Sequence, residues 1–529
     1  CIRDRSNDDD VPFGPFERAF DSADSAIEAG YRPTLEASAA KWAAFWDTAD
    51  VVIDGDAPAQ AALRFSIWHN RIATPAHTDR LPIGARGLSC QAYQGAAFWD
   101  QEMFNLPAFL HTAPEMARNI LVYRWRTLDG ARRKAERLGY EGAYYAWISG
   151  TTGDELCPDF FFDDVLTGRP IRNHFNVWQM HISPDIAITV DRYWDATGDD
   201  EFIVDHGAEI VFEVATFISS FVKFVAHRNR YEIIRLLGPD EWHENVDNDA
   251  YTNRVSELAL EAALRVHAWM TEHHPARLAE LDAGPERLAR WRDVHDRLYV
   301  PEPGPATGVI EQFDGFFELE DARPDELRRR LLDPSEYWGW PNGVAVHTQV
   351  SKQPAVIQLF AVDPGHPLDI QRTNYAFYEP RCAHGSSLSH SVHATVACRF
   401  ADADAGLAQQ AYDYFMDTAT LDLDATQHAV VGGTFIGGMH TAANAGAYQT
   451  AVFGFGGVDI EEGVVKFAPA LPSSWTSLSF TLVVRGQRID ATIGQDGHVV
   501  TARPDNDSAV TLMVGDEATA VEPGGALRW

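Results

Sequence analysis

The order of apolar and polar residues predicts a mainly helical chain with a β-rich end. From residue 15 to 49, apolar residues recur at helical spacing, with Trp42, Phe45 and Trp46 on one face. From residue 57 to about 453, helical stretches alternate with long polar or aromatic loops, and strand-like runs are few. The expected helices cover residues 57–74, 113–138, 184–197, 200–227, 253–274, 277–298, 324–332, 351–361 and 404–417.

The pattern changes after Gly456. Residues 464–472, 478–486, 487–494 and 498–504 alternate or are rich in β-branched residues, with Gly, Asp and Asn between them, which predicts a small β domain. The many helices of similar length suggest helix pairs arranged in a barrel. We therefore expect a linker and helical segment over 1–49, a helical barrel over 50–459 and a C-terminal β domain over 460–529.

Composition narrows the function classes. A chain of 529 residues favours more than one domain. Its net charge of -34 argues against nucleic acid or an anionic membrane as a partner. No run of 18 apolar residues and no signal peptide is visible in the sequence. The chain begins at Cys1 and not at Met, so an N-terminal portion could have been removed.

The arrangement of the five cysteines argues against a fold held together by disulfide bonds or by a metal ion. They are scattered, without a CxxC pair and without a His at metal-ligand spacing. This pattern argues against a disulfide framework or a zinc site. The reducing cytoplasm is therefore the expected location, and no metal ligand is expected.

The run GPDEWHENVDNDAYTN, residues 238–253, concentrates acids, a Trp, a His and several amides, and its Gly-Pro-Asp opening predicts a turn. An acid kept protonated by an apolar neighbour can donate its proton to a glycosidic oxygen. The alternative is a solvated acidic loop that caps a helix.

A second segment, residues 87–107, places Phe98, Trp99, Asp100 and Glu102 together. An indole can stack on a sugar face while the neighbouring acid accepts hydrogen bonds from its hydroxyls. The alternative is a helix whose first turn is capped by Asp100.

Two further segments precede apolar helices. Lys352 and Gln353 open one of them, although a cation is electrostatically unfavourable at a helix start. Within residues 379–400, Ser386 and Ser387 precede a second, and serine hydroxyls with free amides can bind an anion. The alternatives are a solvated lysine and ordinary serine capping.

A glycine-rich segment covers residues 432–446 and allows close approach of the backbone to a ligand. Thr434 and His440 are its candidate donors. The alternative is a tight loop followed by a helix of small residues.

Together these segments resemble glycoside hydrolase family 65, the inverting family of maltose, trehalose, kojibiose and nigerose phosphorylases. The resemblance covers about residues 40–485. It rests on FWDQEMFNLP, GPDEWHENVDNDAYTN, Lys-Gln before an apolar helix, HGSSLS, GFGGV and FAPALPSSWTSLSF. It implies a mainly α fold, an (α/α)6 barrel with its site at one end and a small C-terminal β domain. The family's N-terminal β-sandwich is expected to be absent, either removed or lacking in a shortened form.

The resemblance also implies roles for single residues. Glu241 would be the general acid, with Glu244 as a substrate contact or a competitor for that role. Four residues would contact the glucosyl ring: Trp99, Asp100, Lys352 and Gln353. Four others would lie near the attacking group, which is phosphate in the phosphorylases: Ser386, Ser387, Thr434 and His440.

The attacking group separates the candidate functions. Inverting hydrolysis needs a second carboxylate about 6.5–9.5 Å from the acid to activate water. Family members often have a Glu shortly before the late Gly-x-His, but residues 436–440 contain no acid. Phosphorolysis needs only a pocket of donors for an anion. The most economical hypothesis is therefore inverting phosphorolysis of an α-glucoside, with inorganic phosphate as co-substrate, no cofactor, and β-glucose 1-phosphate as product.

Other functions remain open. An inverting hydrolase, similar to a trehalase or a kojibiose hydrolase, is the second hypothesis, with Glu379 or Asp154 as a source of the base. A non-catalytic glucoside-binding protein is the third, and a metal-dependent hydrolase the last. A homodimer is one option for the assembly. The departure from the family pattern at Cys90-Gln91 and in FWDQE leaves the acceptor undefined.

Overall fold

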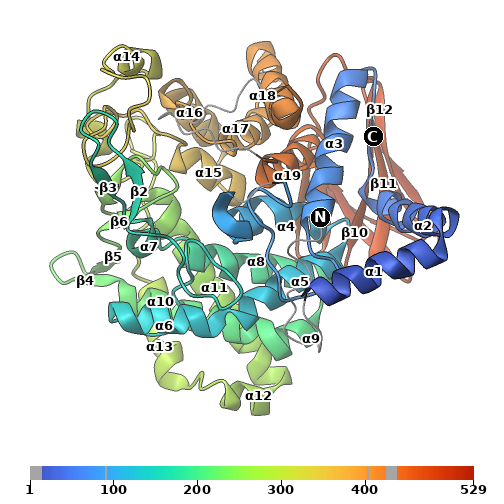
Figure 1. Ribbon diagram of the computed structural model, residues 1–529, viewed down its shortest axis with the longest axis horizontal. Coiled ribbons are helices and arrows are strands. Elements are labelled where there is room, and N and C mark those ends of the chain that lie inside the picture. Colours follow the sequence, from blue (N-terminus) through green and yellow to red (C-terminus); the bar gives the residue numbers. More distant parts are fainter. Residues whose placement is uncertain (1–14, 90–91, 402–403, 425–437) are drawn as a thin grey trace.

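The computed structural model describes residues 15–89, 92–401, 404–424 and 438–529. The helical segment expected over 15–49 is two helices, α1 (Pro15–Ala29) and α2 (Tyr31–Ala49), because Gly30 has φ 82° between them. Trp42 of α2 stacks on Trp46 and on Trp68 of α3 (Ala57–Ala73). Figure 1 shows α2 beside the C-terminal strands, and α2 packs against β10.

Six helical segments form a closed inner ring. In chain order they are η2 (Gln101–Asn105) with α4 (Leu106–Leu110), α8 (Ile182–Thr197), α11 (Ala250–His273), α15 (Ala355–Val362), α17 (Ser389–Cys398), and α19 (Thr441–Gln449) with η7 (Thr450–Phe455). Each segment packs against the next, and α19 returns to η2, so the ring closes (Figure 1).

A second layer of helices covers the ring from outside. It comprises α3, α5 (Pro114–Arg126), α6 (Leu128–Leu138), α9 (Asp200–Phe202), η3 (Ile203–Gly207), α10 (Ala208–Phe221), α12 (Pro275–Glu280), α13 (Pro285–His295), α16 (Leu368–Tyr378) and α18 (Ala405–Asp424). For example, α10 packs on α8 and α11, and α18 packs on α17 and α19. Two concentric layers of this kind make an (α/α)6 barrel, which confirms the expected fold class.

The loops between these layers hold shorter elements. Their helical turns are η1 (Ala92–Gly95), α7 (Phe175–Trp178), η4 (Phe316–Glu318), α14 (Pro324–Arg328) and η5 (Glu379–Arg381). Three two-stranded pairs are β2 (Phe160–Asp163) with β3 (Pro170–Arg172), β4 (Lys223–Val225) with β5 (Arg230–Glu232), and β6 (Leu236–Leu237) with β7 (Glu244–Val246).

The expected C-terminal β domain is confirmed as two sheets. Its strands are β8 (Val458–Glu461), β9 (Val464–Phe467), β10 (Ser477–Val484), β11 (Gln487–Gly494), β12 (Gly497–Ala502), β13 (Val510–Val514), β14 (Glu517–Val521) and β15 (Ala526–Arg528). The sheet orders are β1-β10-β11-β12-β15 and β14-β13-β9-β8. The first includes β1 (Val51–Asp54), an unexpected strand that lies before the barrel in the chain and pairs antiparallel with β10.

Several helix predictions were too long. The helix expected over 200–227 ends at Phe221, because Val222 is extended and β4 follows. The helix expected over 277–298 is interrupted by Asp282, with φ 51°, and restarts at Pro285, whose ring suits a first helical position. Within the described ranges, no helix combines the length and apolar character needed to cross a bilayer.

Candidate active site

The predicted site residues lie at the start of ring helices. Trp99 and Asp100 precede η2, the segment of Glu241 precedes α11, and Lys352 and Gln353 precede α15. Ser386 and Ser387 precede α17, and His440 precedes α19. Thr434 lies outside the described residues. Because the free amides of a helix start favour negative groups, this end of the ring suits anions and polar ligands.

Glu241 and Lys352 form the central contact. Glu241 lies in the turn between β6 and β7, and Lys352 Nζ donates to its Oε2 at 2.5 Å. Their side chains are 16% and 17% exposed, so the pair is accessible to a ligand. The predicted acid and the predicted donor, 111 residues apart in the chain, therefore lie side by side.

Asp240 fixes this arrangement and was not predicted from the sequence. Its Oδ1 accepts from the Lys352 backbone N–H at 2.9 Å, and its Oδ2 accepts from Gln312 Nε2 at 2.9 Å. His243 Nδ1 lies 2.7 Å from the same Oδ2. Asp240 is 2% exposed and joins the Glu241 turn to the loop before α15. We therefore assign it a positioning role.

Glu244 occupies a different environment from Glu241. Its side chain is buried, and its Oε2 lies 2.9 Å from Nδ1 of His174, whose ring stacks on Trp178. Burial, and then the charge of Glu241, raise the pKa of Glu244 to about 8. Glu244 is therefore mostly protonated at neutral pH and can donate a hydrogen bond.

Trp99 and Asp100 form one wall of this region. Trp99 is 3% exposed and makes edge contacts with the rings of Phe104, His181 and Tyr251, so its ring is fixed by packing. Burial raises the pKa of Asp100 to about 6, with Arg86 opposing and the charge of Glu241 adding to the rise. This coupling places Asp100 within the electrostatic reach of Glu241.

Among the described residues of this region, several buried polar atoms lack hydrogen-bond partners, and two of them belong to side chains with a candidate ligand role. Arg86 Nε and Gln353 Oε1 are buried and have no hydrogen-bond partner among the described residues. The Gln353 Nε2 donates to the Pro239 carbonyl at 2.8 Å, which fixes the amide against the Glu241 turn. Buried polar atoms are nearly always paired, so Arg86 Nε is available to donate to a ligand hydroxyl or phosphate oxygen, and Gln353 Oε1 is available to accept from a ligand hydroxyl.

The loop between η5 and α17, residues 382–388, carries Ser386 and Ser387 and is called the serine loop below. It contacts the segment that holds Lys352. The Gly385 N–H donates to the Lys352 carbonyl at 3.1 Å. The Ser386 hydroxyl accepts from the Leu388 N–H at 3.3 Å, a local turn contact before α17. Leu388 is the N-cap of α17, and among the described residues no side chain caps this helix. The Ser387 side chain is partly exposed, and no hydrogen bond is recorded for its hydroxyl within the described ranges. Ser387 is therefore the freer of the two.

His440 is held by a carboxylate on an outer helix. Its Nδ1 lies 2.7 Å from Asp422 Oδ1, and its backbone N–H donates to Asp422 Oδ2 at 2.8 Å. Burial alone would raise the pKa of Asp422, but the contacts from His440 outweigh it and hold the pKa below its ordinary value. The imidazole orientation is thus fixed before any ligand binds.

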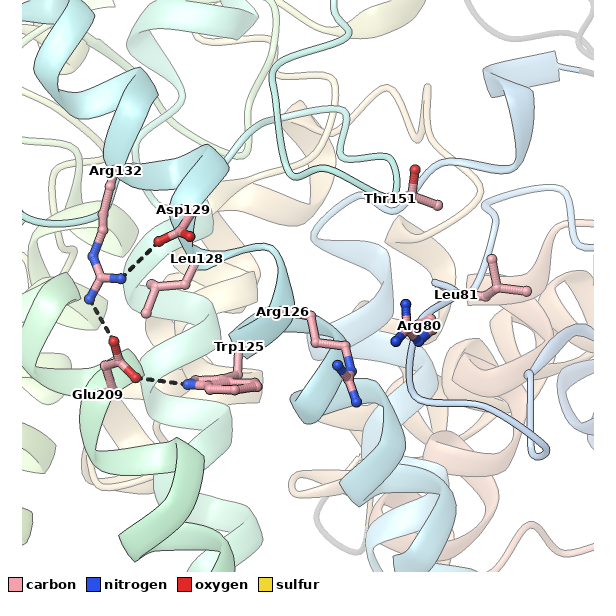
Figure 2. Close-up of a pocket in the computed structure, with 9 residues that line it drawn as sticks. All are labelled: Arg80, Leu81, Trp125, Arg126, Leu128, Asp129, Arg132, Thr151 and Glu209. Carbon is pink, nitrogen blue, oxygen red and sulfur yellow. Dashed lines mark hydrogen bonds and ion pairs between the residues drawn. The ribbon is translucent and has the colours of Figure 1, made fainter. Parts of the chain in front are cut away.

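A surface hollow lies away from this group of residues. Figure 2 shows it beside α5 and α6, with a volume of about 440 Å³. Its charges are already compensated, because Arg132 pairs with Asp129 and Glu209, and Arg126 pairs with Asp79. Trp125 Nε1 donates to Glu209 at 2.8 Å. This surface is an ion-pair network that joins the loops to the outer helices.

The sequence profile of the glycosyl hydrolase family 65 central catalytic domain matches residues 64–449. The chain belongs to glycosyl hydrolase family 65. The profile of the family 65 C-terminal domain matches residues 458–521, the part that holds β8 to β14.

Relatives within family 65 cover most of this chain. A 1,2-alpha-glucosylglycerol phosphorylase of Bacillus selenitireducens is 49% identical over 93% of the chain, and a nigerose phosphorylase of Lachnoclostridium phytofermentans is 40% identical over 89%. The chain spans 64% and 62% of these two proteins, less than two thirds of their length.

A solved structure supports the fold. It is a protein from the human microbiome assigned provisionally as a kojibiose phosphorylase. It superposes with a TM-score of 0.84 at 23% identity, over 97% of this chain and 67% of that one.

Proposed function

We propose that this chain catalyses inverting phosphorolysis of an α-linked glucoside, giving β-glucose 1-phosphate and the free acceptor. The contact that carries the proposal is Lys352, whose Nζ reaches Glu241 while its carbonyl holds the serine loop through the Gly385 N–H. One residue thus links a candidate acid to a candidate anion site. The phosphorylase relatives support the same reaction class.

The proposed reaction divides the work between the two groups. Once Lys352 has moved from the Glu241 carboxylate to the incoming phosphate, Glu241 takes up a proton from solvent. It transfers that proton to the glycosidic oxygen as the bond between this oxygen and the anomeric carbon breaks. A phosphate oxygen, held near Ser387 and the start of α17, forms the new bond from the opposite face, which inverts the configuration. The Lys352 ammonium would leave the Glu241 carboxylate and bind the phosphate instead. Protonated Glu244 would donate a hydrogen bond to the sugar. The phosphate is a co-substrate, and the reaction needs no organic cofactor.

The geometry disfavours the hydrolase hypothesis for the two bases considered. Asp154 lies in a loop and pairs with Arg133 of the outer helix α6 at 2.7 Å, and both side chains are about half exposed. Glu379 is engaged by His393, Tyr414 and Gln410. Neither carboxylate is free to activate a water against a sugar.

The substrate class follows from the relatives and remains a proposal. Proteins similar to this chain act, by name, on glucosylglycerol, nigerose, kojibiose and trehalose. We propose an α-glucosyl donor with a small polyol or a hexose as acceptor, and 1,2-α-glucosylglycerol as the first compound to test.

The first experiment incubates the chain with a panel of α-linked glucosides, with and without phosphate, and resolves products by NMR. β-Glucose 1-phosphate that forms only with phosphate would establish the proposal. Free β-glucose formed at the same rate without phosphate would replace it with hydrolysis. Glu241→Gln should lower turnover by on the order of 10²–10⁴-fold while sugar binding persists, whereas a pure binding protein would lose nothing.

The serine loop gives a more specific prediction. Ser387→Ala should raise the KM for phosphate by on the order of 10-fold, because a hydrogen bond to a charged group contributes about 1.5–3 kcal/mol. Steady-state kinetics at saturating glucoside measure this. Ser391→Ala is the matched control, since Ser391 Oγ donates to the Leu388 carbonyl within the same helix. An equal rise in both variants would contradict an anion site at Ser387.

A further inference from the structure

Directly behind the serine loop, three side chains with metal-binding atoms come together. They are Cys382, His384 and His393, and one ligand atom of each lies within 4.8 Å of the others. Cys382 is 6% exposed and His393 is 1% exposed. The cluster is therefore an interior feature that the proposed reaction does not use directly.

His393 is oriented as a metal ligand would be. Its Nδ1 is bound by the carboxylate of Glu379, which is itself held by Tyr414 and Gln410. Its Nε2 is buried and has no hydrogen-bond partner among the described residues. An unpaired buried nitrogen costs free energy, and a carboxylate on the other ring nitrogen is the arrangement that orients metal-binding histidines.

Cys382 and His384 complete the group. His384 has φ 48°, a left-handed conformation that is uncommon for residues other than glycine, and its Nδ1 lies 2.5 Å from Ser389 Oγ. Cys382 Sγ lies 3.8 Å from the same hydroxyl. The ligand atoms thus converge around one point, with Ser389 beside it.

We propose that Cys382, His384 and His393 bind a zinc-class divalent ion. One thiolate and two imidazoles match the ligand preference of such an ion, and Ser389 or a water would provide the fourth position. Bonds of about 2.0–2.3 Å require ligand atoms about 3.3–3.8 Å apart, so side chains would shift by about 1 Å or less. The thiolate and Glu379 would offset the double positive charge.

The proposal departs from the sequence expectation that no residue binds a metal. Two ligands lie on the loop at Cys382 and His384, and the third lies one helical turn inside α17, so no compact motif appears in the chain. A cation here would fix the loop that carries Ser386 and Ser387. It would also place positive charge behind the proposed phosphate site.

The test measures metal and not turnover, so its outcome is independent of the proposed reaction. The full chain is stripped with a chelator, equilibrated with Zn²⁺ or Co²⁺, dialysed and analysed by elemental mass spectrometry. We expect about one equivalent per chain and, with Co²⁺, a thiolate charge-transfer absorption band. Cys382→Ala and His393→Gln should lose both. Cys398→Ala is the matched control, since Cys398 is a buried free cysteine on the same helix, and it should keep both.

Two further measurements do not depend on those variants folding. Bound Zn²⁺ should slow alkylation of Cys382 in the unmodified chain and leave the rate at Cys157 unchanged. Glu379→Gln should weaken Zn²⁺ binding by on the order of 10–100-fold. Less than a tenth of an equivalent of metal in the unmodified chain, or equal retention by Cys382→Ala, would overturn the proposal.

Discussion

Glu244 makes the stability of the folded chain depend on pH. An ordinary Glu has a pKa of 4.5, whereas burial and Glu241 raise the pKa of Glu244 to about 8. Below pH 4.5 the residue is protonated in both the folded and the unfolded state. Between pH 4.5 and 8 only the unfolded state loses the proton, so stability falls as pH rises, by at most about 5 kcal/mol. Glu244→Gln should lack this part of the decline.

Denaturant unfolding from pH 5 to pH 8.5 measures the effect. The difference in unfolding free energy between Glu244→Gln and the unmodified chain should grow with pH. Glu286→Gln is the control, because Glu286 is exposed on α13 and its curve should run parallel to that of the unmodified chain. Parallel curves for Glu244→Gln as well would mean that Glu244 is ionised in the folded protein.

At the same scale, sequence could give the residue types of the site but not their partners. The acidic run shows Glu241 and Glu244 without separating their roles. Their difference comes from the burial of Glu244 and from their separate partners, Lys352 for Glu241 and His174 for Glu244, which lie 111 and 70 residues away in the chain. Asp240 is visible as the first acid of the same run, but its contact with Lys352 has no signature in the sequence.

At the scale of helices and strands, the position of Asp100 at the start of η2 depends on a buried ion pair between α5 and η2. Arg124 of α5 forms two hydrogen bonds of 2.7 Å with Glu102 of η2, and both side chains are fully buried. Glu102→Gln leaves the Arg124 charge uncompensated in the interior. The free energy of unfolding should fall by about 3–5 kcal/mol.

The neighbouring pair provides a control for that variant. Arg126 of the same helix pairs with Asp79 at 2.9 Å, with both side chains about one third exposed. Asp79→Asn should cost about 1 kcal/mol or less. Denaturant midpoints compare the stabilities of Glu102→Gln and Asp79→Asn directly. Equal losses of stability in the two variants would show that burial of the Arg124–Glu102 pair does not make it more important than the exposed pair.

The same scale shows which elements sequence can predict. Long amphipathic helices such as α3 and α11 follow their apolar periodicity within a few residues. The strands β6 and β7 have two and three residues, too few for a period to appear. This strand pair orients the Glu241 turn. The geometry of the site therefore depends on elements that are too short to predict from the sequence.

For the whole molecule, the net charge of -34 opposes the approach of phosphate. Under the proposed function, the attraction would be local and would come from Lys352, Arg86 and the helix starts. Salt screens the long-range repulsion, because the Debye length falls from about 30 Å at 0.01 M to about 10 Å at 0.1 M. The KM for phosphate should therefore fall by roughly twofold or more over this range, measured with a salt of a bulky monovalent anion.

A neutral glucoside serves as the internal control for this effect. Its KM should not change with salt, since the net charge exerts no force on it. A phosphate KM that rises steadily with salt would show that local positive charge dominates at all distances. The sequence gives the net charge directly, whereas the grouping of helix starts at one end appears only once the ring is closed.

The pairing of β1 with β10 has a consequence for biosynthesis. Val51 pairs with Phe480, so 429 residues must follow Val51 before its partner exists. At about 5–20 residues per second, the apolar segment Val51–Ile53 waits on the order of 20–90 s with an unpaired edge. The nascent chain therefore carries an unpaired, aggregation-prone strand until β10 has been synthesised, and truncation before Ser477 would make that exposure permanent.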